Sequence, residues 1–352
     1  MYVKDSSHTC IHQCKHKCVK TAVVILNYNT AGYLEKFLPG LIASVAGMDA
    51  GVIVADNASS DGSAAMMKEK FPETRLIELS ANYGFTGGYN TALEQVDAEY
   101  YVLINSDIEV PTGWLSPLVE YMDSHPECGA CGPKLLSYYD RGSFEYAGAA
   151  GGYIDMFGYP FCRGRIMQKL ERDCGQYDTA EDVLWCSGAC LLVRSSLWKS
   201  LGGLDDRFFA HMEEIDLCWR IQLHGYRVTC LPQSHVYHIG GGTLSNESPF
   251  KLRLNFRNNL LLLENNLPST YRALGMSETM CRISTRVKIF IRMVLDGASA
   301  VVYLLKGQPK FAGAIFKAHS EYRSMRRPGE LIGNPSYPKG IKKTLIVPKG
   351  LF

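Results

Sequence analysis

The chain has 352 residues, of which 46% are hydrophobic and 20% charged, a composition ordinary for a soluble globular protein with one large α/β domain and an appendage. The formal net charge is only +2, but residues 271–352 hold 15 Lys and Arg against 4 Asp and Glu, so a basic tail follows an acidic body. No run of about 18 uncharged apolar residues occurs, which excludes a membrane-spanning helix.

The first segment, residues 1–20, lacks the apolar core of a secretory signal, so we expect a cytoplasmic protein. The 12 cysteines of the whole chain are then expected to be reduced thiols rather than a disulfide framework. The segment is rich in alternating His and Cys, namely His8, Cys10, His12, Cys14, His16 and Cys18. This spacing fits no established zinc finger, so we predict a flexible tail and leave adventitious zinc binding as the alternative.

Strands and helices alternate from residue 21 onward. Continuous apolar runs predict strands over 21–29, 51–57, 75–80 and 100–107, and helical patterns over 34–45, 64–71 and 88–96 lie between them. A glycine-rich loop is expected at 82–90. Buried strands that alternate with helices indicate a doubly wound, mostly parallel sheet, so the fold class is α/β and Rossmann-like.

Polar residues end three of these strands or flank the glycine-rich loop. They are Asn27, Asn29, Asp56, Asn57, Asn105, Asp107, Asn82 and Asn90. Ligands collect beyond the carboxyl ends of strands in open α/β sheets, so this edge predicts a nucleotide crevice, with Asp56 accepting hydrogen bonds from a base or ribose. A strand-end Asp107 that only caps the next turn is the alternative. Neither the dinucleotide fingerprint nor the P-loop is present.

The second half of the chain is less regular. Residues 145–165 and 171–198 are typical of loops and antiparallel strands in a substrate-facing half, and a helix is expected over 212–223. Glu213 and Glu214 would lie in its first turn, where stabilisation by the helix dipole is the alternative to a catalytic role. Asp216 and Arg220, four residues apart, are predicted to form a structural pair.

Taken together, seven segments resemble glycosyltransferase family 2 enzymes of the GT-A fold, particularly bacterial rhamnosyltransferase-like and galactofuranosyltransferase-like members. They are "VVILNYN", "VIVADNASSDGS", "NYGFTGGYN", "VLINSDIEV", "WCSGACLLVR", "LGGLDDRFFAHMEEIDLCWR" and "HVYHIGGGT". The resemblance spans residues 21 to about 265. The expected division is therefore a tail over 1–20, a GT-A domain over 21–265 and a basic, partly amphipathic helical region over 266–352.

The resemblance implies a nucleoside diphosphate sugar as donor. It assigns Asn27, Asn29, Asp56 and Asn57 to the nucleoside side, and Asn82, Gly87 and Asn90 to the phosphate and sugar side. Asp107 resembles the last acid of the family's Asp-x-Asp metal motif, whose first position here is Asn105, and His238 matches a histidine near the metal and diphosphate. The implied cofactor is Mg²⁺ or Mn²⁺, held more weakly than usual because Asn105 lacks a charge.

The remaining assignments concern catalysis and the acceptor. Glu214 takes the position of the family's catalytic base, which is usually Asp, and its neighbour Glu213 is the second catalytic candidate. Trp185, Ser187 and Gly188 resemble the acceptor side, with the Trp185 ring as a platform for a sugar. His211 and His235 are expected to be structural or peripheral.

These assignments imply an inverting hexosyltransferase. Glu214 would deprotonate an acceptor hydroxyl that displaces the nucleoside diphosphate. The resemblance favours dTDP-rhamnose as donor and a glycan or polyprenyl-linked acceptor in cell-surface polysaccharide synthesis. A glycosidase would not need the nucleotide crevice. A non-catalytic nucleotide-sugar-binding protein remains an alternative, supported by Asn105 and Glu214.

The basic tail holds an apolar stretch over 289–305 that Arg292 and Asp296 interrupt. This pattern favours an interfacial amphipathic helix that seats the protein on the anionic inner face of the cell membrane. A helical cap on the catalytic domain or a contact within a homo-oligomer is the alternative. Nucleic acid matches the tail less well, and we predict no nucleic-acid partner.

Overall fold

The computed structural model describes residues 19–146, 148–166, 169–240 and 248–343. The His and Cys residues of the predicted N-terminal tail, with their alternative of zinc binding, lie outside the described residues. The nine described cysteines are free thiols, and all but Cys174 are buried.

The first part of the chain forms a parallel sheet in the order β3-β2-β1-β4, with helices in the connections. The bounds are β1 Thr21–Asn27, α1 Ala31–Ser44, β2 Ala50–Asp56, α2 Ser63–Lys70, β3 Arg75–Glu78, α3 Gly84–Leu93 and β4 Tyr100–Ile104. The β4 strand is buried along its whole length and β1 nearly so, since helices cover both faces of the sheet. The predicted strand and helix alternation is thereby confirmed.

The sheet continues beyond β4 with strands of mixed direction, in the order β4-β12-β6-β13-β11. β12 is antiparallel to both β4 and β6, whereas β13 is parallel to β6 and antiparallel to β5 and β11. A small antiparallel sheet has the order β10-β9-β8-β7. The bounds are β5 Ile108–Glu109, α4 Ser116–Ser124, β6 Cys128–Ser137, β7 Gly152–Ile154, β8 Pro160–Cys162, β9 Arg165–Ile166, β10 Lys169–Leu170, β11 Glu181–Asp182, β12 Cys190–Arg194, α5 Ser195–Ser200, η1 Asp206–Phe208, α6 Glu213–Leu223 and β13 Arg227–His238.

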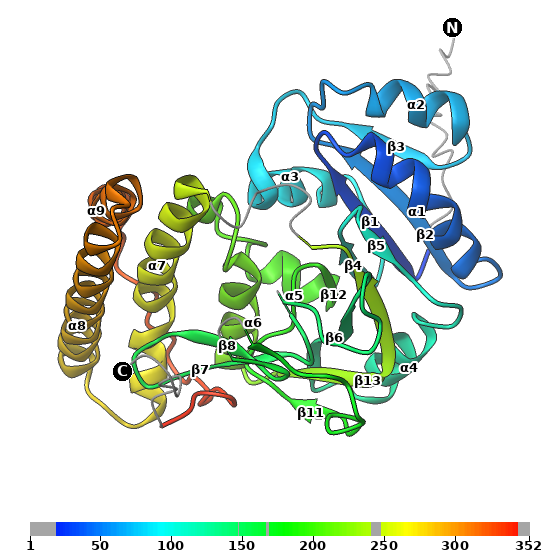
Figure 1. Cartoon of the computed structure of the whole chain (residues 1–352). Coiled ribbons are helices and arrows are strands. Elements are labelled where there is room, and N and C mark those ends of the chain that lie inside the picture. Colours follow the sequence, from blue (N-terminus) through cyan, green and yellow to red (C-terminus); the bar gives the residue numbers. More distant parts are fainter. Residues whose placement is uncertain (1–18, 147, 167–168, 241–247, 344–352) are drawn as a thin grey trace, which may run out of the picture.

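Two apolar cores lie on the two faces of the main sheet, between the sheet and the helices that cover it. Side chains of α1, α2 and α4 pack on one face of the main sheet, and those of α3, α5, α6 and α7 pack on the other. The C-terminal helices α7 (Pro249–Ala273), α8 (Glu278–Leu305) and α9 (Pro309–Met325) form an outer layer beside α6, which Figure 1 shows on the left. Residue 265, the expected domain boundary, lies within α7 rather than between helices.

The glycine-rich segment 82–90 was expected to be a loop, and this expectation is wrong. Helix α3 begins at Gly84 and contains Gly87 and Gly88. A Cβ at Gly88 would lie 2.8 Å from a side-chain carbon of Leu26, so glycine lets the helix approach β1. Gly84 has a φ of +72°, and a Cβ there would lie 2.5 Å from the Phe209 ring. These glycines serve close packing at the edge of the sheet rather than a flexible phosphate loop.

Candidate active site

A cavity of about 470 Å³ opens at the carboxyl ends of the parallel strands. The ends of β1, β2, β4 and β13 and the first turns of α6 and α7 contribute to its wall. Nine of the predicted site residues line it: Asn57, Asn82, Asn105, Asp107, Ser187, Gly188, Glu213, Glu214 and His238. The fold therefore brings together residues that lie up to 181 positions apart in the sequence.

Asp107 and His238 meet on one side of this cavity. His238 Nε2 lies 3.1 Å from Asp107 Oδ1, and His238 Nδ1 lies 3.4 Å from Glu145 Oε1. Asn105 Nδ2 is 3.4 Å from the same Nε2. Burial lowers the pKa of His238, but hydrogen bonds and charge attraction from Asp107 and Glu145 outweigh it and raise the pKa to about 10. The imidazole is thus held as a cation between two carboxylates. To ligate a metal ion it must give up the proton on Nε2, so a bound cation would take the place of that proton between His238 and Asp107.

The chemistry of this donor set fits a divalent cation. A carboxylate oxygen, an amide and an imidazole nitrogen converge at Asp107, Asn105 and His238, and oxygen and nitrogen donors of this kind hold Mg²⁺ or Mn²⁺. Glu145, which is 5% exposed, binds the far nitrogen of the ring and orients the other toward the cavity. Among the described residues, no three His, Cys, Asp or Glu side chains are grouped so that they alone could hold a metal ion.

Glu213 and Glu214 begin helix α6 at the same cavity. Burial raises the pKa of Glu213 well above its usual range, and the neighbouring charge of Glu214 raises it further. Burial also raises the pKa of Glu214, but backbone N–H groups, including that of Gly188, oppose this shift. If the pair holds one proton, it belongs on Glu213, and Glu214 remains the carboxylate. Gly188 also makes room, since a Cβ there would lie 3.3 Å from Glu214 Cβ.

The segment before α6 is strained. Phe209, His211 and Met212 all have positive φ values, 64°, 71° and 71°, which side chains other than glycine rarely adopt. Asn258 of α7 holds this segment: its Nδ2 lies 3.0 Å from the carbonyl oxygen of Phe208 and 2.7 Å from those of Ala210 and His211. The buried amide of one helix therefore fixes the loop that aims Glu213 and Glu214 into the cavity.

The predicted nucleoside side forms a hydrogen-bonded cluster beside the cavity. Asn27 donates to Asp56 Oδ1 at 2.7 Å, and Ser59 N donates to Asp56 Oδ2 at 3.0 Å. Asn29 Oδ1 accepts from the backbone N of Ser60 at 2.7 Å. These residues end β1 and β2 in register, but Asn27, Asn29 and Asp56 do not line the 470 Å³ cavity itself. Asn57 does, and it joins the two groups by donating to Asn82 Oδ1 at 3.1 Å.

Three further predicted site residues, besides Asn27, Asn29 and Asp56, do not line the cavity. The Asn90 amide donates to Leu204 O and to Asp206 Oδ1, both at 2.8 Å, so it joins α3 to Leu204 and to the start of η1. Gly87 lies in α3, and a Cβ there would lie 2.9 Å from the Cβ of Tyr83, the residue that precedes the helix. Trp185 is a correction to the predicted acceptor platform: its ring is buried against Gly152, and its Nε1 donates to Tyr153 O at 3.2 Å. A tryptophan so enclosed offers no face to a sugar.

Other residues that were not predicted as site residues line or support the cavity. They are Thr30, Phe85, Ser106, Phe209, His211, Phe250 and Lys251 in its wall, and Glu145 behind His238. His211, expected at the periphery, lies in this wall, where burial first and the charge of Lys251 second lower its pKa to about 4. Its position two residues before Glu213 in the sequence could have indicated a place near the site. His235, by contrast, lies beside Tyr237 and outside the cavity, as expected.

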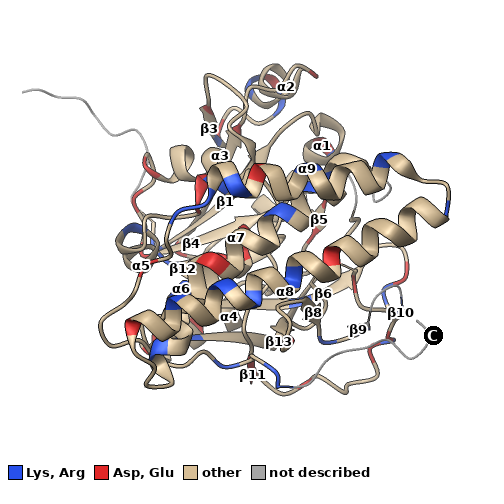
Figure 2. Cartoon of the chain, turned by 90° about the vertical axis from the view of Figure 1, so that its left-hand side faces the viewer, with Lys and Arg blue, Asp and Glu red and all other residues tan. Residues whose placement is uncertain are grey.

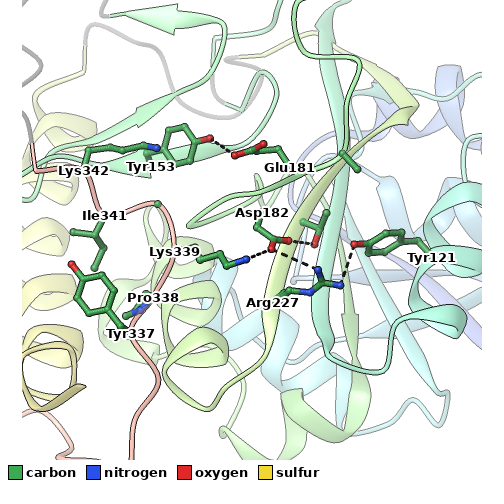
Figure 3. A pocket seen from close by; sticks show the side chains of 13 residues that line it. Tyr121, Tyr153, Glu181, Asp182, Arg227, Tyr337, Pro338, Lys339, Ile341 and Lys342 are labelled. Atoms are coloured by element: carbon green, nitrogen blue, oxygen red, sulfur yellow. Dashed lines mark hydrogen bonds and ion pairs between the residues drawn. The ribbon is translucent and has the colours of Figure 1, made fainter. Parts of the chain in front are cut away.

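A second hollow, of about 630 Å³, lies at the β11 edge of the main sheet and is lined by Glu181, Asp182, Arg227 and the segment 337–342. Figure 3 shows that its charged groups face one another. Lys339 Nζ lies 2.6 Å from Asp182 Oδ2, and Arg227 Nη1 lies 3.7 Å from the same oxygen. Because Lys339 and Arg227 both pair with Asp182, we do not assign this hollow as the active site. The Asp216–Arg220 pair predicted from the sequence is also confirmed, at 2.7 Å.

Known proteins resemble the chain in both sequence and fold. The model of Glycosyl transferase family 2 matches residues 22–198. An N-acetylglucosaminyl-diphospho-decaprenol L-rhamnosyltransferase of Mycobacterium tuberculosis is 29% identical over 231 residues, which cover 61% of this chain and 75% of the relative. The rhamnosyltransferase WbbL of Escherichia coli K12 is 26% identical over 227 residues, 61% of this chain and 82% of the relative.

Among solved structures, a mannosyltransferase from Pyrobaculum calidifontis in complex with GDP-Man and Mn²⁺ superposes with a TM-score of 0.52 at 15% identity, covering 88% of this chain and 89% of that one. GalNAc-T7 with UDP, GalNAc and Mn²⁺ also gives a TM-score of 0.52, at 14% identity, over 70% of this chain and 48% of that one. These likenesses confirm the expected GT-A fold.

Proposed function

Since the chain belongs to glycosyltransferase family 2 and its relatives support a glycosyltransferase of polysaccharide synthesis, we propose that it transfers a sugar with inversion from a nucleoside diphosphate donor to an acceptor hydroxyl. The donor we propose is dTDP-rhamnose, because two relatives are named rhamnosyltransferases. The acceptor we propose is a glycan or a polyprenyl-linked sugar, following the diphospho-decaprenol in one relative's name.

One observation carries this proposal: two adjacent carboxylates, the buried Glu213 and the half-buried Glu214, share a cavity with the Asp107–His238 centre. In this reaction, Glu214 accepts the proton of the acceptor hydroxyl, and the hydroxyl oxygen forms the new bond to the anomeric carbon. The bond from that carbon to the diphosphate oxygen breaks on the opposite face, so the anomeric configuration inverts. Glu213 keeps its proton and adds no second negative charge beside the attacking oxygen.

Asp107, Asn105 and His238 would hold a divalent cation, with Glu145 orienting the imidazole. When bound, Mg²⁺ or Mn²⁺ supplies positive charge that stabilises the departing diphosphate. The nucleoside would lie toward Asp56 and Asn27, with Asn57 and Asn82 between it and the reaction centre. Ser187 and Gly188, on the turn that faces Glu214, are the proposed acceptor contacts.

The experiment is a thermal-shift panel of nucleotide sugars with the purified full chain, with and without Mg²⁺ or Mn²⁺. We expect dTDP-rhamnose to raise the Tm only with metal, and product to form when an acceptor is added. A donor present at about 100 times its Kd would raise the free energy of unfolding by about 2.7 kcal/mol. A shift with another donor would correct the sugar, and binding with no turnover by any acceptor tested would favour the non-catalytic alternative.

We also propose that the catalytic unit extends past the expected boundary at residue 265. The support is that α7 runs continuously from Pro249 to Ala273 and is bound to α6 beyond the boundary: Asn266 donates to Asp216 Oδ1 at 2.8 Å, and Trp219 donates to Thr270 Oγ1 at 3.0 Å.

A further inference from the structure

Helix α8 presents apolar side chains to the outside along most of its length. Phe290 is 67% exposed and Leu305 is 83% exposed. The stripe formed by these outward residues, called here the α8 apolar face, comprises Met280, Ile283, Val287, Phe290, Ile291, Val294, Val301, Val302 and Leu305. Their spacing of three and four residues places them on one side of a helix. A helix that only covered the domain would turn such residues inward.

The inward side of the same helix carries charge instead. Arg292 and Asp296 are 4% and 0% exposed, and Arg292 Nε lies 2.7 Å from Asp296 Oδ1. Arg292 Nη1 donates to Asn259 of α7 at 2.7 Å, and His319 Nε2 of α9 lies 3.1 Å from Asp296 Oδ2. Buried charges therefore fasten α8 to α7 and α9, and its apolar side chains remain outside. This reverses the usual arrangement at a water-facing surface.

Basic residues border the α8 apolar face. Lys310, Lys317 and Arg323 are exposed along α9, which packs against α8, and Arg286 and Lys306 are exposed on α8 and just after it. The acidic residues described on these two helices are engaged elsewhere: Glu278 with Arg282, Asp296 internally, and Glu321 with Arg253 and Arg257. Figure 2 shows α8 and α9 on one face of the molecule, with blue Lys and Arg positions at intervals along both helices.

One end of the α8 apolar face lies close to the active-site cavity. Leu252 and Phe256 of α7 pack with Ala300 of α8 and with Ala312 and Ile315 of α9. The neighbouring α7 residues Phe250 and Lys251 line the cavity. The C-terminal end of α8 and the start of α9 are thus joined through two turns of α7 to the cavity wall.

From these observations we propose that the α8 apolar face, with its basic border, docks on an anionic lipid bilayer. The apolar side chains enter the interface between headgroups and acyl chains, and the lysines and arginines bind anionic headgroups. A second copy of the chain fits less well, since pairing two such faces would bring two basic borders together. The one exposed acidic residue described on these two helices, Glu278, is already paired with Arg282. Among the described helices, none has the length and hydropathy needed to cross a bilayer.

The test is co-sedimentation of the full chain with two kinds of vesicle, one of phosphatidylcholine alone and one with about 30% phosphatidylglycerol. Binding to each is measured at low and at high salt. We expect binding only to the anionic vesicles and weakening with salt. The double substitution Phe290→Glu and Val294→Glu should reduce binding at least tenfold, because both side chains lie in the centre of the face. Leu170→Glu, at an exposed leucine of β10, is the matched control and should bind as the original chain does.

Three outcomes would overturn the proposal. Equal loss in the Leu170→Glu control would mean that any added charge acts nonspecifically. Full binding by the double variant, with circular dichroism showing a native fold, would exclude the α8 apolar face. A dimer by analytical ultracentrifugation that the double variant converts to a monomer, without vesicle binding by either, would make this face a contact between subunits. Lys310→Glu with Lys317→Glu, which leaves the apolar residues intact, should abolish the preference for anionic vesicles.

Discussion

Asp107 Oδ1 and His238 Nε2 lie 3.1 Å apart although 131 residues separate them in the sequence. The pairing of β5 with β13, in which Ile108 opposes His238, fixes this contact through the backbone. Replacing Asp107 with Asn keeps the size of the side chain but removes its charge. We expect Mn²⁺ affinity, measured by electron paramagnetic resonance without any donor, to fall by about 10-fold or more. Asp49→Asn, at an exposed carboxylate, should leave it unchanged, and equal affinities in all three proteins would contradict the assignment.

Glu145 is predicted to act on the metal through His238, because its carboxylate lies 3.4 Å from Nδ1. Glu145→Gln should weaken Mn²⁺ binding by roughly 10- to 100-fold, the usual effect of losing a carboxylate behind a ligand histidine. Donor binding without metal, measured by calorimetry, should change much less. A variant that unfolds would be recognised by circular dichroism, and in that case Glu145→Asp, which keeps the charge, should restore part of the affinity. Unaltered metal binding by a folded Glu145→Gln protein would refute this role.

The two adjacent glutamates should respond differently to the same substitution. Glutamine resembles a protonated carboxyl group, so Glu213→Gln reproduces the state in which burial holds Glu213. We expect kcat within about tenfold of the original for Glu213→Gln, and a loss of roughly 10²- to 10⁴-fold for Glu214→Gln, with donor Kd retained in both. Steady-state kinetics and donor titration would measure this. If Glu213→Gln lost activity and Glu214→Gln kept it, the roles of the two residues would be exchanged.

Asn258 is predicted to stabilise both the fold and the geometry of the site. Its Nδ2 reaches the carbonyl oxygens of Phe208, Ala210 and His211, beside residues with positive φ. Asn258→Ala should lower the free energy of unfolding by about 1–3 kcal/mol, since the carbonyls of Ala210 and His211 lose this donor, whereas that of Phe208 keeps Arg257. Urea denaturation would measure this, and kcat should fall more than donor affinity. Asn334→Ala, at an exposed asparagine, serves as control. A folded Asn258→Ala protein of full stability and activity would exclude the clamp.

The sequence predicted the strands and their polar ends well because buried parallel strands are continuous apolar runs, as in Val23 to Ile25. The motifs then assigned Asn57, Asp107 and Glu214 to one site at the carboxyl ends of the strands, and all three line the cavity there. The glycine segment and Trp185 were misassigned because a sequence does not tell which surface a small or aromatic side chain packs against. Glu145 and Asn258 could not be selected. The role of Glu145 arises only when His238 of β13 lies beside it, and that of Asn258 only when α7 packs against residues 208–211.

The last prediction concerns pH and His211. Burial lowers its pKa to about 4 in the folded state, from an ordinary value of 6.5, so between these values the unfolded chain binds more protons than the folded one. The contribution of this residue to stability is therefore complete above pH 6.5 and is lost as the pH falls toward 4.

Replacing His211 with Leu should remove this dependence, by an amount on the order of 3 kcal/mol between pH 7 and pH 4. Urea denaturation of both proteins across that range would measure the difference. Lys251, Glu213 and Glu214 line the same cavity, and their charges remain in the variant, so subtracting the two curves isolates His211. Because raised carboxyl pKa values favour the folded state at low pH, the two glutamates act in the opposite direction. Parallel stability curves for the two proteins would show that His211 titrates alike in the folded and unfolded chain, contrary to its burial in the cavity wall.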